Sequence, residues 1–318
     1  MIARVLTAAV NGVDGHIVEV EVDLAQGLPF FSTVGLPEGA VRESKDRVKA
    51  AIKNCGYEFP ARRITVNLAP AAVRKAGAGY DLPIAVGILA ASGLFAYEDH
   101  RQQMVVGELS LDGTVRPVRG ILPMVLAARA ESGIDRFFVP AANAEEAAVV
   151  DNIDVIGIES LHQLVEILSK VRDPVITRVD VQELFGDLGA YEVDFAEVKG
   201  QEHAKRALEI AAAGGHNILL SGVPGTGKTM LARRLPTILP DLTLEEALET
   251  TKIYSSTGLL PADTPLMVTR PFRAPIIPFP MPGSLAVARC PGQARCPWLI
   301  MACFFSTNCR SSRNMCSR

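Results

Sequence analysis

The chain has 318 residues, a formal net charge of −3 and an apolar content of 48%. This length accommodates about two domains, and the apolar content is sufficient for buried cores. No stretch reaches the roughly 20 uninterrupted apolar residues that a membrane helix needs, and residues 1–10 show none of the regions of a signal peptide. These totals argue against an integral membrane protein and favour a soluble protein of the cytoplasm.

Charge and cysteine are unevenly distributed along the chain. Residues 276–318 contain five arginines and five of the six cysteines but no lysine and no acidic residue. Residues 1–275 hold 27 basic and 35 acidic residues, so their net charge is −8 and that of the remainder is +5. The chain therefore changes character after Pro275.

Residues 1–171 show strands and helices in mixed order. Alternating apolar residues predict strands, and apolar residues at helical spacing predict helices. The expected strands are residues 16–22, 29–34, 63–68, 104–109, 135–139 and 155–157. The expected helices are residues 39–54, 82–92, 121–130, 145–149 and 160–171. Residues 172–197 lack sustained periodicity, and we interpret them as a linker.

A second pattern occupies residues 198–275. It consists of a helix at residues 201–213 that Gly214 and Gly215 end, a strand at residues 217–221, a glycine-rich loop, and a helix at residues 228–239. A strand, a loop and a helix in this order form the context in which phosphate-binding loops occur. The sequence therefore predicts an α/β chain with a nucleotide-binding second domain.

The glycine-rich loop matches G-x-x-x-x-G-K-[ST] in full. The glycines let the main chain bend so that its N–H groups point at a phosphate, and the helix that follows adds the positive end of its dipole. Lys228 is expected to reach the β and γ oxygens of ATP, and Thr229 to place its hydroxyl on Mg²⁺. The alternative is a structural glycine turn. The predicted ATP site consists of Gly222, Val223, Pro224, Gly225, Thr226, Gly227, Lys228 and Thr229.

ATP hydrolysis needs further residues that the sequence does not supply. An acidic pair at the end of a following strand holds Mg²⁺ and orients water, and an arginine meets the γ-phosphate. Residues 242–318 contain no apolar strand that ends in Asp-Glu. The acidic residues near a helix expected from Leu244 onward are interpreted as solvated surface, and no catalytic residue is assigned. They are Asp241, Glu245, Glu246 and Glu249.

Seven motifs follow one another along residues 1–275. They are GLPEGAVRESKDRV at residues 35–48, ITVNLAP at 64–70, KAG at 75–77, YDLP at 80–83, VKGQEH at 198–203, GGHNILLSGVPGTGK at 214–228 and RPFRAP at 270–275. In this order they resemble the ComM/YifB family of magnesium chelatase-like AAA+ proteins.

This resemblance implies an α+β domain like ribosomal protein S5 and Lon protease at residues 1–171. A partial AAA+ core related to the magnesium chelatase I subunit would follow at residues 198–275. The family role that it implies is ATP-driven DNA remodelling by a homo-hexamer, with branch migration during natural transformation. Because the acidic strand is missing, we expect this chain to be deficient in hydrolysis. A nucleotide-dependent binding module without turnover and a magnesium chelatase I-type subunit stay open.

The Lon-like similarity raises proteolysis as a rival function. Lon uses a serine paired with a lysine. The corresponding segments of this chain offer Tyr80 in place of the serine and Leu122 ahead of the Ala-Ala helix. Ser44 and Lys45 are adjacent on a helix and therefore face different directions. Proteolysis is not expected.

The residues after Pro275 depart from the family. Relatives continue with HHTISHAG and later with LDELPEF, whereas residues 276–283 of this chain read IIPFPMPG. Reading each codon one base earlier permits the family residues at both places, so we hypothesise a single-base frameshift at the junction of Pro275 and Ile276. Residues 276–318 are then expected to be poorly ordered and without an evolved function. The alternatives are a basic nucleic-acid tail and a zinc site, although no close C-x₂₋₄-C pair occurs among Cys290, Cys296, Cys303, Cys309 and Cys316.

A few single residues have two interpretations each. His203 either approaches the adenine or has a surface or packing role. Arg273 either faces DNA or stabilises a hairpin. A group of cations either touches a phosphate backbone or forms a solvated helix face. This group consists of Lys45, Arg47, Lys49, Lys53, Arg62 and Arg63.

Overall fold

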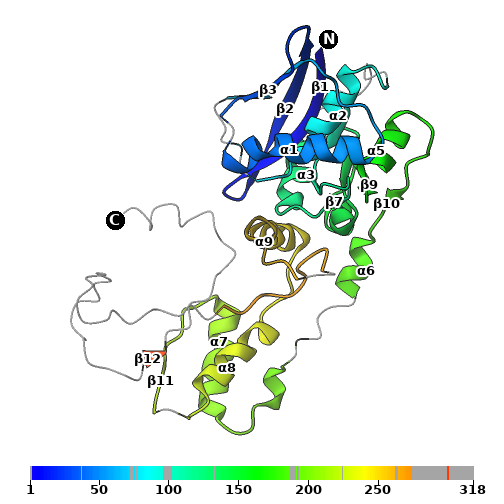
Figure 1. Ribbon diagram of the computed structural model, residues 1–318. Helices are drawn as coiled ribbons and strands as arrows, with labels where there is room; N and C mark the ends of the chain where they lie inside the picture. The colour runs from blue at the N-terminus through cyan, green and yellow to red at the C-terminus, as the bar shows by residue number, and fades with distance from the viewer. Residues whose placement is uncertain are drawn as a thin grey trace, which may run out of the picture. The chain divides into compact units, whose positions relative to one another are not determined.

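A computed structural model (Figure 1) describes most of residues 2–273. The chain forms two compact units, Met1–Leu184 with Leu248–Met267, and Phe185–Ala247 with Val268–Arg318. No helix within the described residues combines the length and apolar character needed to cross a membrane. The described residues are 2–36, 38–71, 75, 77–95, 102–131, 133–186, 191, 193–223, 225–261, 264–273 and 299–300.

The first unit is built on an eight-stranded mixed sheet with the order β10-β9-β8-β5-β1-β2-β4-β3. The pairs β1–β5, β5–β8, β8–β9 and β3–β4 are parallel, and β1–β2, β2–β4 and β9–β10 are antiparallel. The strands are β1 Ile2–Asn11, β2 Asp14–Ala25, β3 Phe30–Val34, β4 Arg63–Ala69, β5 Gln103–Val105, β8 Arg136–Pro140, β9 Asp154–Ile158 and β10 Ile176–Thr177. A separate two-stranded ribbon pairs β6 Glu108–Leu109 with β7 Val115–Arg116.

Helices cover both faces of this sheet. Alternate residues of one strand point to opposite faces, and in β1 Val5 belongs to one buried cluster whereas Ala8 belongs to the other. Residues of α1, α2 and α5 complete the first cluster, and residues of α3 and α4 complete the second. The helices are α1 Gly39–Asn54, α2 Asp81–Ala91, α3 Ile121–Ala130, α4 Ala144–Ala148, α5 Leu161–Leu168 and α6 Val181–Gly186. A 3₁₀ turn, η2 Ala141–Asn143, precedes α4.

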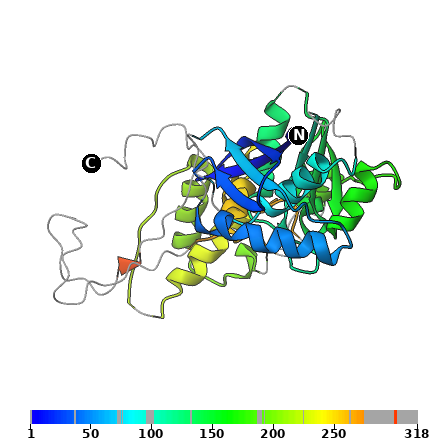
Figure 2. The same cartoon turned by 45° about the horizontal axis from the view of Figure 1, so that its top comes forward.

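The helix α1 is amphipathic and α2 is not. In α1, Val41, Val48 and Ile52 are fully buried, while the lysines of the helix are exposed. Every residue of α2 is buried, which explains its uniformly apolar sequence after Asp81. In Figure 2 the blue helix α1 lies beside the blue strands at the start of the chain.

The helix α9 Leu244–Thr257 contributes to the first unit from Leu248 onward. Leu248 packs against the cluster that α3 and α4 complete, and Ser255 is buried. The Ser255 hydroxyl donates a hydrogen bond to the carboxylate of Glu146, and the Gly120 N–H donates to the Ser255 carbonyl at 3.1 Å. Residues 248–267 are thus joined to the first unit by apolar packing and by buried hydrogen bonds.

The second unit contains the glycine-rich loop between β11 and α8. Its small core consists of Phe195, Val198, Leu208, Ala212, Leu231 and Leu235. Leu220–Ser221 of β11 pair antiparallel with Leu299–Ile300 of β12. The other elements are η3 Phe195–Glu197, α7 Glu202–Gly214, α8 Lys228–Arg234 and η4 Leu235–Ile238.

Several predicted elements are confirmed and others are wrong. The helices expected at residues 39–54 and 121–130 have the predicted bounds, and α7 ends at Gly214 with Gly215 in the left-handed conformation. The strand Ile2–Asn11 was not predicted at all. The strand expected at residues 104–109 is two strands, and the helix expected at 228–239 changes to a 3₁₀ turn at Leu235.

The segment interpreted as a linker contains regular structure. It includes β10, α6 and η3, all of them short. In the tail that was expected to be poorly ordered, Leu299–Ile300 form the strand β12. Residues 274–298 and 301–318 lie outside the described residues, so the frameshift hypothesis, the disorder expected of the rest of the tail and the alternative cysteine site are untested predictions.

Candidate functional site

The glycine-rich loop connects β11 to α8. Gly225 has φ +84° and Gly227 has φ +81°, and both values lie in the left-handed region that favours glycine. These two residues flank Thr226, whose hydroxyl donates to the Val223 carbonyl at 2.9 Å. The loop is therefore a tight turn that specifically needs glycine at two of its positions.

Lys228 folds over this loop. Its ammonium Nζ donates to the Val223 carbonyl at 2.7 Å, to the Gly222 carbonyl at 2.9 Å and to the Thr226 hydroxyl at 3.3 Å. Within the part of the chain that the structure describes, no carboxylate forms an ion pair with Lys228. The loop thus carries one positive charge that no described side chain neutralises.

The remaining residues of the predicted ATP site lie around this lysine. Val223, Gly225, Thr226 and Thr229 are exposed, and Gly222 and Gly227 are half-buried. Pro224 lies outside the described residues. The structure places the described members next to one another in one loop and the first turn of α8, but their assignment to ATP and Mg²⁺ stays a prediction.

Packing beneath the loop positions α8. Leu231 and Leu235 are buried against Leu208 of α7 and against Phe195. The Gln201 side-chain amide donates to the Thr226 carbonyl at 3.4 Å, so the residue before α7 contacts the loop directly. Sequence reasoning assigned no role to Gln201, although it lies in the VKGQEH motif. His203, two residues further on, is exposed.

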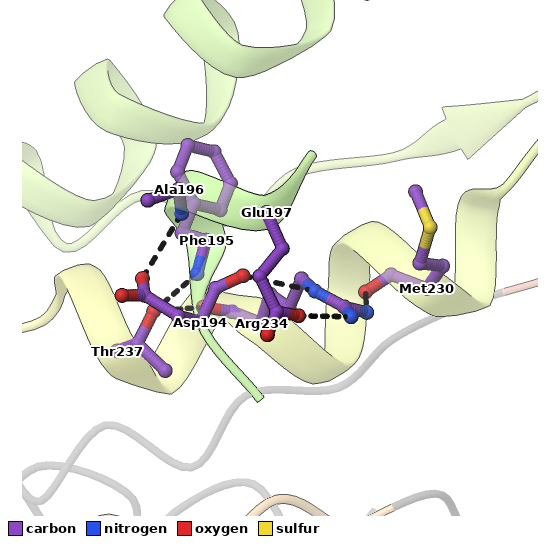
Figure 3. Close-up of polar contacts among 7 residues, drawn as sticks. All are labelled: Asp194, Phe195, Ala196, Glu197, Met230, Arg234 and Thr237. Atoms are coloured by element: carbon purple, nitrogen blue, oxygen red, sulfur yellow. Dashed lines mark hydrogen bonds and ion pairs between the residues drawn. The ribbon is translucent and has the colours of Figure 1, made fainter. Parts of the chain in front are cut away.

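A hydrogen-bonded cluster around Arg234 holds the segment 194–197 against α8 (Figure 3). The guanidinium donates to the Asp194 carbonyl at 2.9 Å, to the Glu197 carboxylate at 2.6 Å and to the Met230 carbonyl at 3.4 Å. The Phe195 N–H donates to the Thr237 hydroxyl at 3.1 Å, and that hydroxyl donates to the Arg234 carbonyl at 2.8 Å. The bond from Arg234 lowers the pKa of Glu197. No motif in the sequence indicated this cluster.

Arg270, the first residue of the RPFRAP motif, anchors to the start of α9. Its guanidinium donates to the Glu246 carboxylate at 3.0 Å and to the Pro240 carbonyl at 2.7 Å. The main-chain N–H of Arg270 also donates to the Tyr191 hydroxyl, at 3.2 Å. Glu246 is therefore half of an ion pair and not a freely solvated acid. Arg273 is exposed, and its predicted roles stay open.

Acidic residues do not gather into a metal site in the described part of the chain. No group of three or more His, Cys, Asp or Glu side chains there is arranged to hold a metal ion. The metal-ligand role predicted for Thr229 does not require such a group of side chains, because a P-loop hydroxyl shares Mg²⁺ with phosphate oxygens and waters. Glycine-rich turns that carry a lysine are, in general, suited to phosphate groups.

These features define an α/β protein with a glycine-rich loop of the phosphate-binding type between a strand and a helix. Two family models match the chain: "Subunit ChlI of Mg-chelatase" matches residues 20–143, and "Magnesium chelatase, subunit ChlI" matches residues 194–281. Proteins of this magnesium chelatase-like AAA+ type generally bind ATP with Mg²⁺. The first match lies within the predicted domain 1–171, and the second covers the predicted core 198–275 and extends beyond it at both ends.

Curated relatives are similar over most of the chain. The uncharacterized protein Rv2897c of Mycobacterium tuberculosis is 46% identical over 274 residues, which are 86% of this chain and 54% of the relative. The competence protein ComM of Haemophilus influenzae is 42% identical over 277 residues, 86% of this chain and 53% of ComM. The uncharacterized protein YifB of Salmonella typhimurium is 44% identical over 277 residues, again 86% and 53%. The chain belongs to the ComM/YifB family of magnesium chelatase-like proteins.

The extent of these similarities is limited in two ways. The chain spans about half the length of the curated relatives that it matches. A shorter similarity links it to the archaeal Lon protease of Archaeoglobus fulgidus, with 44% identity over 52 residues, 16% of this chain.

Proposed function

We propose that this chain binds ATP with Mg²⁺ at residues 222–229. The observation that carries the proposal is the ammonium of Lys228, which lies over a tight glycine-rich turn and donates to loop carbonyls and one hydroxyl. A cation without a carboxylate partner among the described residues, placed on such a turn, fits the charge of nucleotide phosphates. The residues present therefore fit the group that the family generally binds.

Each residue of the loop has a distinct role in this proposal. The main chain of residues 222–227 would surround the phosphates, since Gly225 and Gly227 permit the sharp bend. Lys228 would exchange its bonds to the Gly222 and Val223 carbonyls for bonds to phosphate oxygens. The Thr229 hydroxyl is exposed and would bind Mg²⁺, whose charge offsets that of the phosphates.

Titration with a fluorescent ATP analogue tests the site. Lys228→Ala is expected to weaken binding by at least about tenfold, because a charge-assisted contact to phosphate is lost. Thr229→Ala is expected to reduce the dependence of binding on Mg²⁺. Lys199→Ala is the matched control, since Lys199 is an exposed lysine of the same unit outside the loop. Equal affinities of Lys228→Ala and the control would refute the site.

The wider role that we propose is the family's ATP-driven DNA remodelling, with branch migration in natural transformation. Similarity to a protein named for competence supports it. A homo-hexamer in the cytoplasm belongs to the same proposal. Light scattering of the chain with and without ATP and Mg²⁺ measures the assembly, and a monomer under both conditions would contradict the hexamer.

Binding without turnover is the activity that we propose for these 318 residues. Hydrolysis requires an acidic pair on a later strand, and the sequence of residues 242–318 contains no Asp-Glu dipeptide. Phosphate release measured beside nucleotide binding separates the two activities. Steady turnover that Lys228→Ala abolishes would overturn this part of the proposal.

A second candidate function is that of a magnesium chelatase I-type subunit. Both matching family models are described as subunit ChlI, which favours it. Similarity over 86% of the chain to ComM favours the DNA role instead. Stimulation of Mg²⁺ insertion into a porphyrin by this chain, in the presence of the partner subunits, would support the chelatase role.

The domain organisation completes the proposal. We infer an S5/Lon-like domain at residues 1–171, a linker at 172–197 and a partial AAA+ core at 198–275, supported by the mixed sheet and by the short Lon similarity. We also propose the frameshift at Pro275. Sequencing the gene through this junction tests it, because the family continuation must then appear in the adjacent frame.

A further inference from the structure

The segment from α1 to the start of β4 carries a local excess of positive charge. Residues 39–63 contain seven basic and three acidic residues, in a chain whose net charge is −3. One of the seven, Arg47, forms an ion pair with Asp81, with hydrogen bonds of 2.7 and 3.0 Å. Five others are exposed, and we call them the basic surface: Lys45, Lys49, Lys53, Arg62 and Arg63.

The three lysines are held on one side of a rigid helix. They follow one another at intervals of four residues on α1, so they lie roughly 6 Å apart along the helix axis. Val41, Val48 and Ile52 of α1 are completely buried and fix the helix against the core. The main chain that carries these charges is therefore ordered before any ligand binds.

No carboxylate neutralises the basic surface in the part of the chain that the structure describes. None of its five cations forms an ion pair there, although Glu43 and Asp46 belong to the same helix. In the same unit Arg4 and Arg47 have carboxylate partners. The five cations are available to an external polyanion.

Aromatic rings lie beside two of these cations. The Lys49 ammonium is 6.0 Å from the centre of the Phe59 ring, and the Arg63 guanidinium is 5.9 Å from that of Phe30. Phe59 packs against the core, whereas Phe30 is 58% exposed on the edge strand β3. Cations that bind phosphates, interleaved with rings on which bases stack, are the combination that binds single strands.

We propose that the basic surface and Phe30 bind a single strand of DNA. The proposal deepens the function proposed above by naming a surface of the first unit that contacts the nucleic acid, and it depends on that function only for the choice of DNA over RNA. A duplex keeps its bases stacked inside and would leave Phe30 without a partner, so the exposed ring favours a single strand.

Fluorescence anisotropy of a labelled oligo-dT with the full 318-residue chain tests the proposal. The variant Lys45→Gln, Lys49→Gln, Lys53→Gln is expected to weaken binding by at least about tenfold and to reduce the slope of log K against log salt concentration by about 2. The control Arg129→Gln, Arg136→Gln, Lys170→Gln removes the same charge from exposed residues elsewhere in the unit. Equal affinity and slope for the two triple variants would overturn the proposal.

Phe30→Ala tests the single-strand assignment. It is expected to weaken binding of oligo-dT by roughly tenfold through the loss of one stacked base, and to leave binding of a duplex unchanged. Val34→Ala on the same strand is the control, because Val34 is also exposed. Tighter binding of the duplex than of oligo-dT would overturn the single strand, and tighter binding of oligo-U would overturn DNA.

These measurements are independent of the nucleotide site. They are made without ATP, and Lys228→Ala is expected to bind oligo-dT as the unchanged chain does. If the glycine-rich loop fails to bind nucleotide but the lysine variant loses oligo-dT, the proposed function fails and this inference stands. If the loop binds nucleotide and the lysine variant keeps oligo-dT, the inference fails and the proposed function stands.

Discussion

The buried carboxylate of Glu146 joins three parts of the first unit, and removing it is expected to destabilise that unit. Glu146 is 9% exposed. It accepts hydrogen bonds from the Leu122 N–H at 3.1 Å, from the Asn143 amide at 3.2 Å and from the Ser255 hydroxyl. Glu146→Ala removes all three bonds and leaves the buried Leu122 N–H without an acceptor.

The expected loss can be estimated from these contacts. Hydrogen bonds to a charged group contribute about 1.5–3 kcal/mol each, and an unsatisfied buried group costs about 1–3 kcal/mol. Part of this is offset because the desolvation cost of the buried charge also disappears. We expect Glu146→Ala to lower the free energy of unfolding of the first unit by about 2–4 kcal/mol.

Urea denaturation followed by circular dichroism measures this change, and amide hydrogen exchange at Leu122 and Met124 locates it. The neighbouring Glu145→Ala is the control, because Glu145 is exposed. Ser255→Ala removes one of the three bonds. In a double-mutant cycle Glu146 and Ser255 are expected to couple by about 1 kcal/mol, since they share a bond. If Glu146→Ala and Glu145→Ala destabilise equally, the reasoning is wrong.

Three further changes test other parts of the structure. Burial raises the pKa of Asp81 to about 6 although Arg47 lowers it. The folded state then binds a proton more tightly than the unfolded state, so the stability that this group contributes is expected to fall as the pH rises from about 4 to 6. The difference in unfolding free energy between the unchanged chain and Asp81→Asn, measured by denaturation across this pH range, checks the prediction. Gly35→Ala is expected to destabilise β3, because Gly35 has φ +98° and an added Cβ would lie 2.2 Å from the Leu68 carbonyl oxygen. Thermal denaturation measures the loss. Gly12→Ala is the control, because Gly12 has φ +68° but an added Cβ there would meet no atom within 4 Å. Lys252→Gln removes the ion pair with Asp14, and because Asp14 is exposed we expect a change below about 1 kcal/mol in the same denaturation assay.

The periodicity of apolar residues predicted those elements that bury one side and expose the other. The helix Gly39–Asn54 alternates between a buried and an exposed side, so its pattern and its bounds agree with the structure. The strand Ile2–Asn11 was missed because its middle, residues 7–9, is buried on both faces and shows no alternation of apolar and polar residues. The strand expected at residues 104–109 divides at Gly107. The Val106 N–H still donates to the Phe138 carbonyl of β8, whereas the Gly107 N–H donates to the Gly79 carbonyl outside the sheet.

The candidate site was predicted as a motif but not as a structure. G-x-x-x-x-G-K-[ST] specifies the loop because glycine and lysine have conformational and chemical properties that no other residues share. The contacts that support the loop come from residues distant in sequence. Gln201 and Arg234 are ordinary polar residues, and only the fold shows that Arg234 reaches Asp194, 40 positions away.

Of these supporting residues, Arg234 is linked most directly to the loop, because it ends the helix α8 that begins at Lys228. Its guanidinium donates in three directions, to two main-chain carbonyls and to Glu197. A lysine in its place has one nitrogen on a flexible stem and does not reproduce the fork of bonds. Arg234→Lys is therefore expected to release the segment 194–197 and to weaken nucleotide binding, while Lys228 itself is unchanged.

Arg233→Lys is the matched control, since Arg233 is exposed and lies next to Arg234 in the same helix. The loss of the bond to the Asp194 carbonyl alone is expected to cost about 1 kcal/mol. Hydrogen exchange at Phe195 and Ala196 reports the release, because the N–H groups of both residues are hydrogen-bonded in the cluster. If exchange there rises in Arg234→Lys while nucleotide affinity stays at the level of Arg233→Lys, then the loop does not depend on this cluster, and the packing of Leu231 and Leu235 alone positions it.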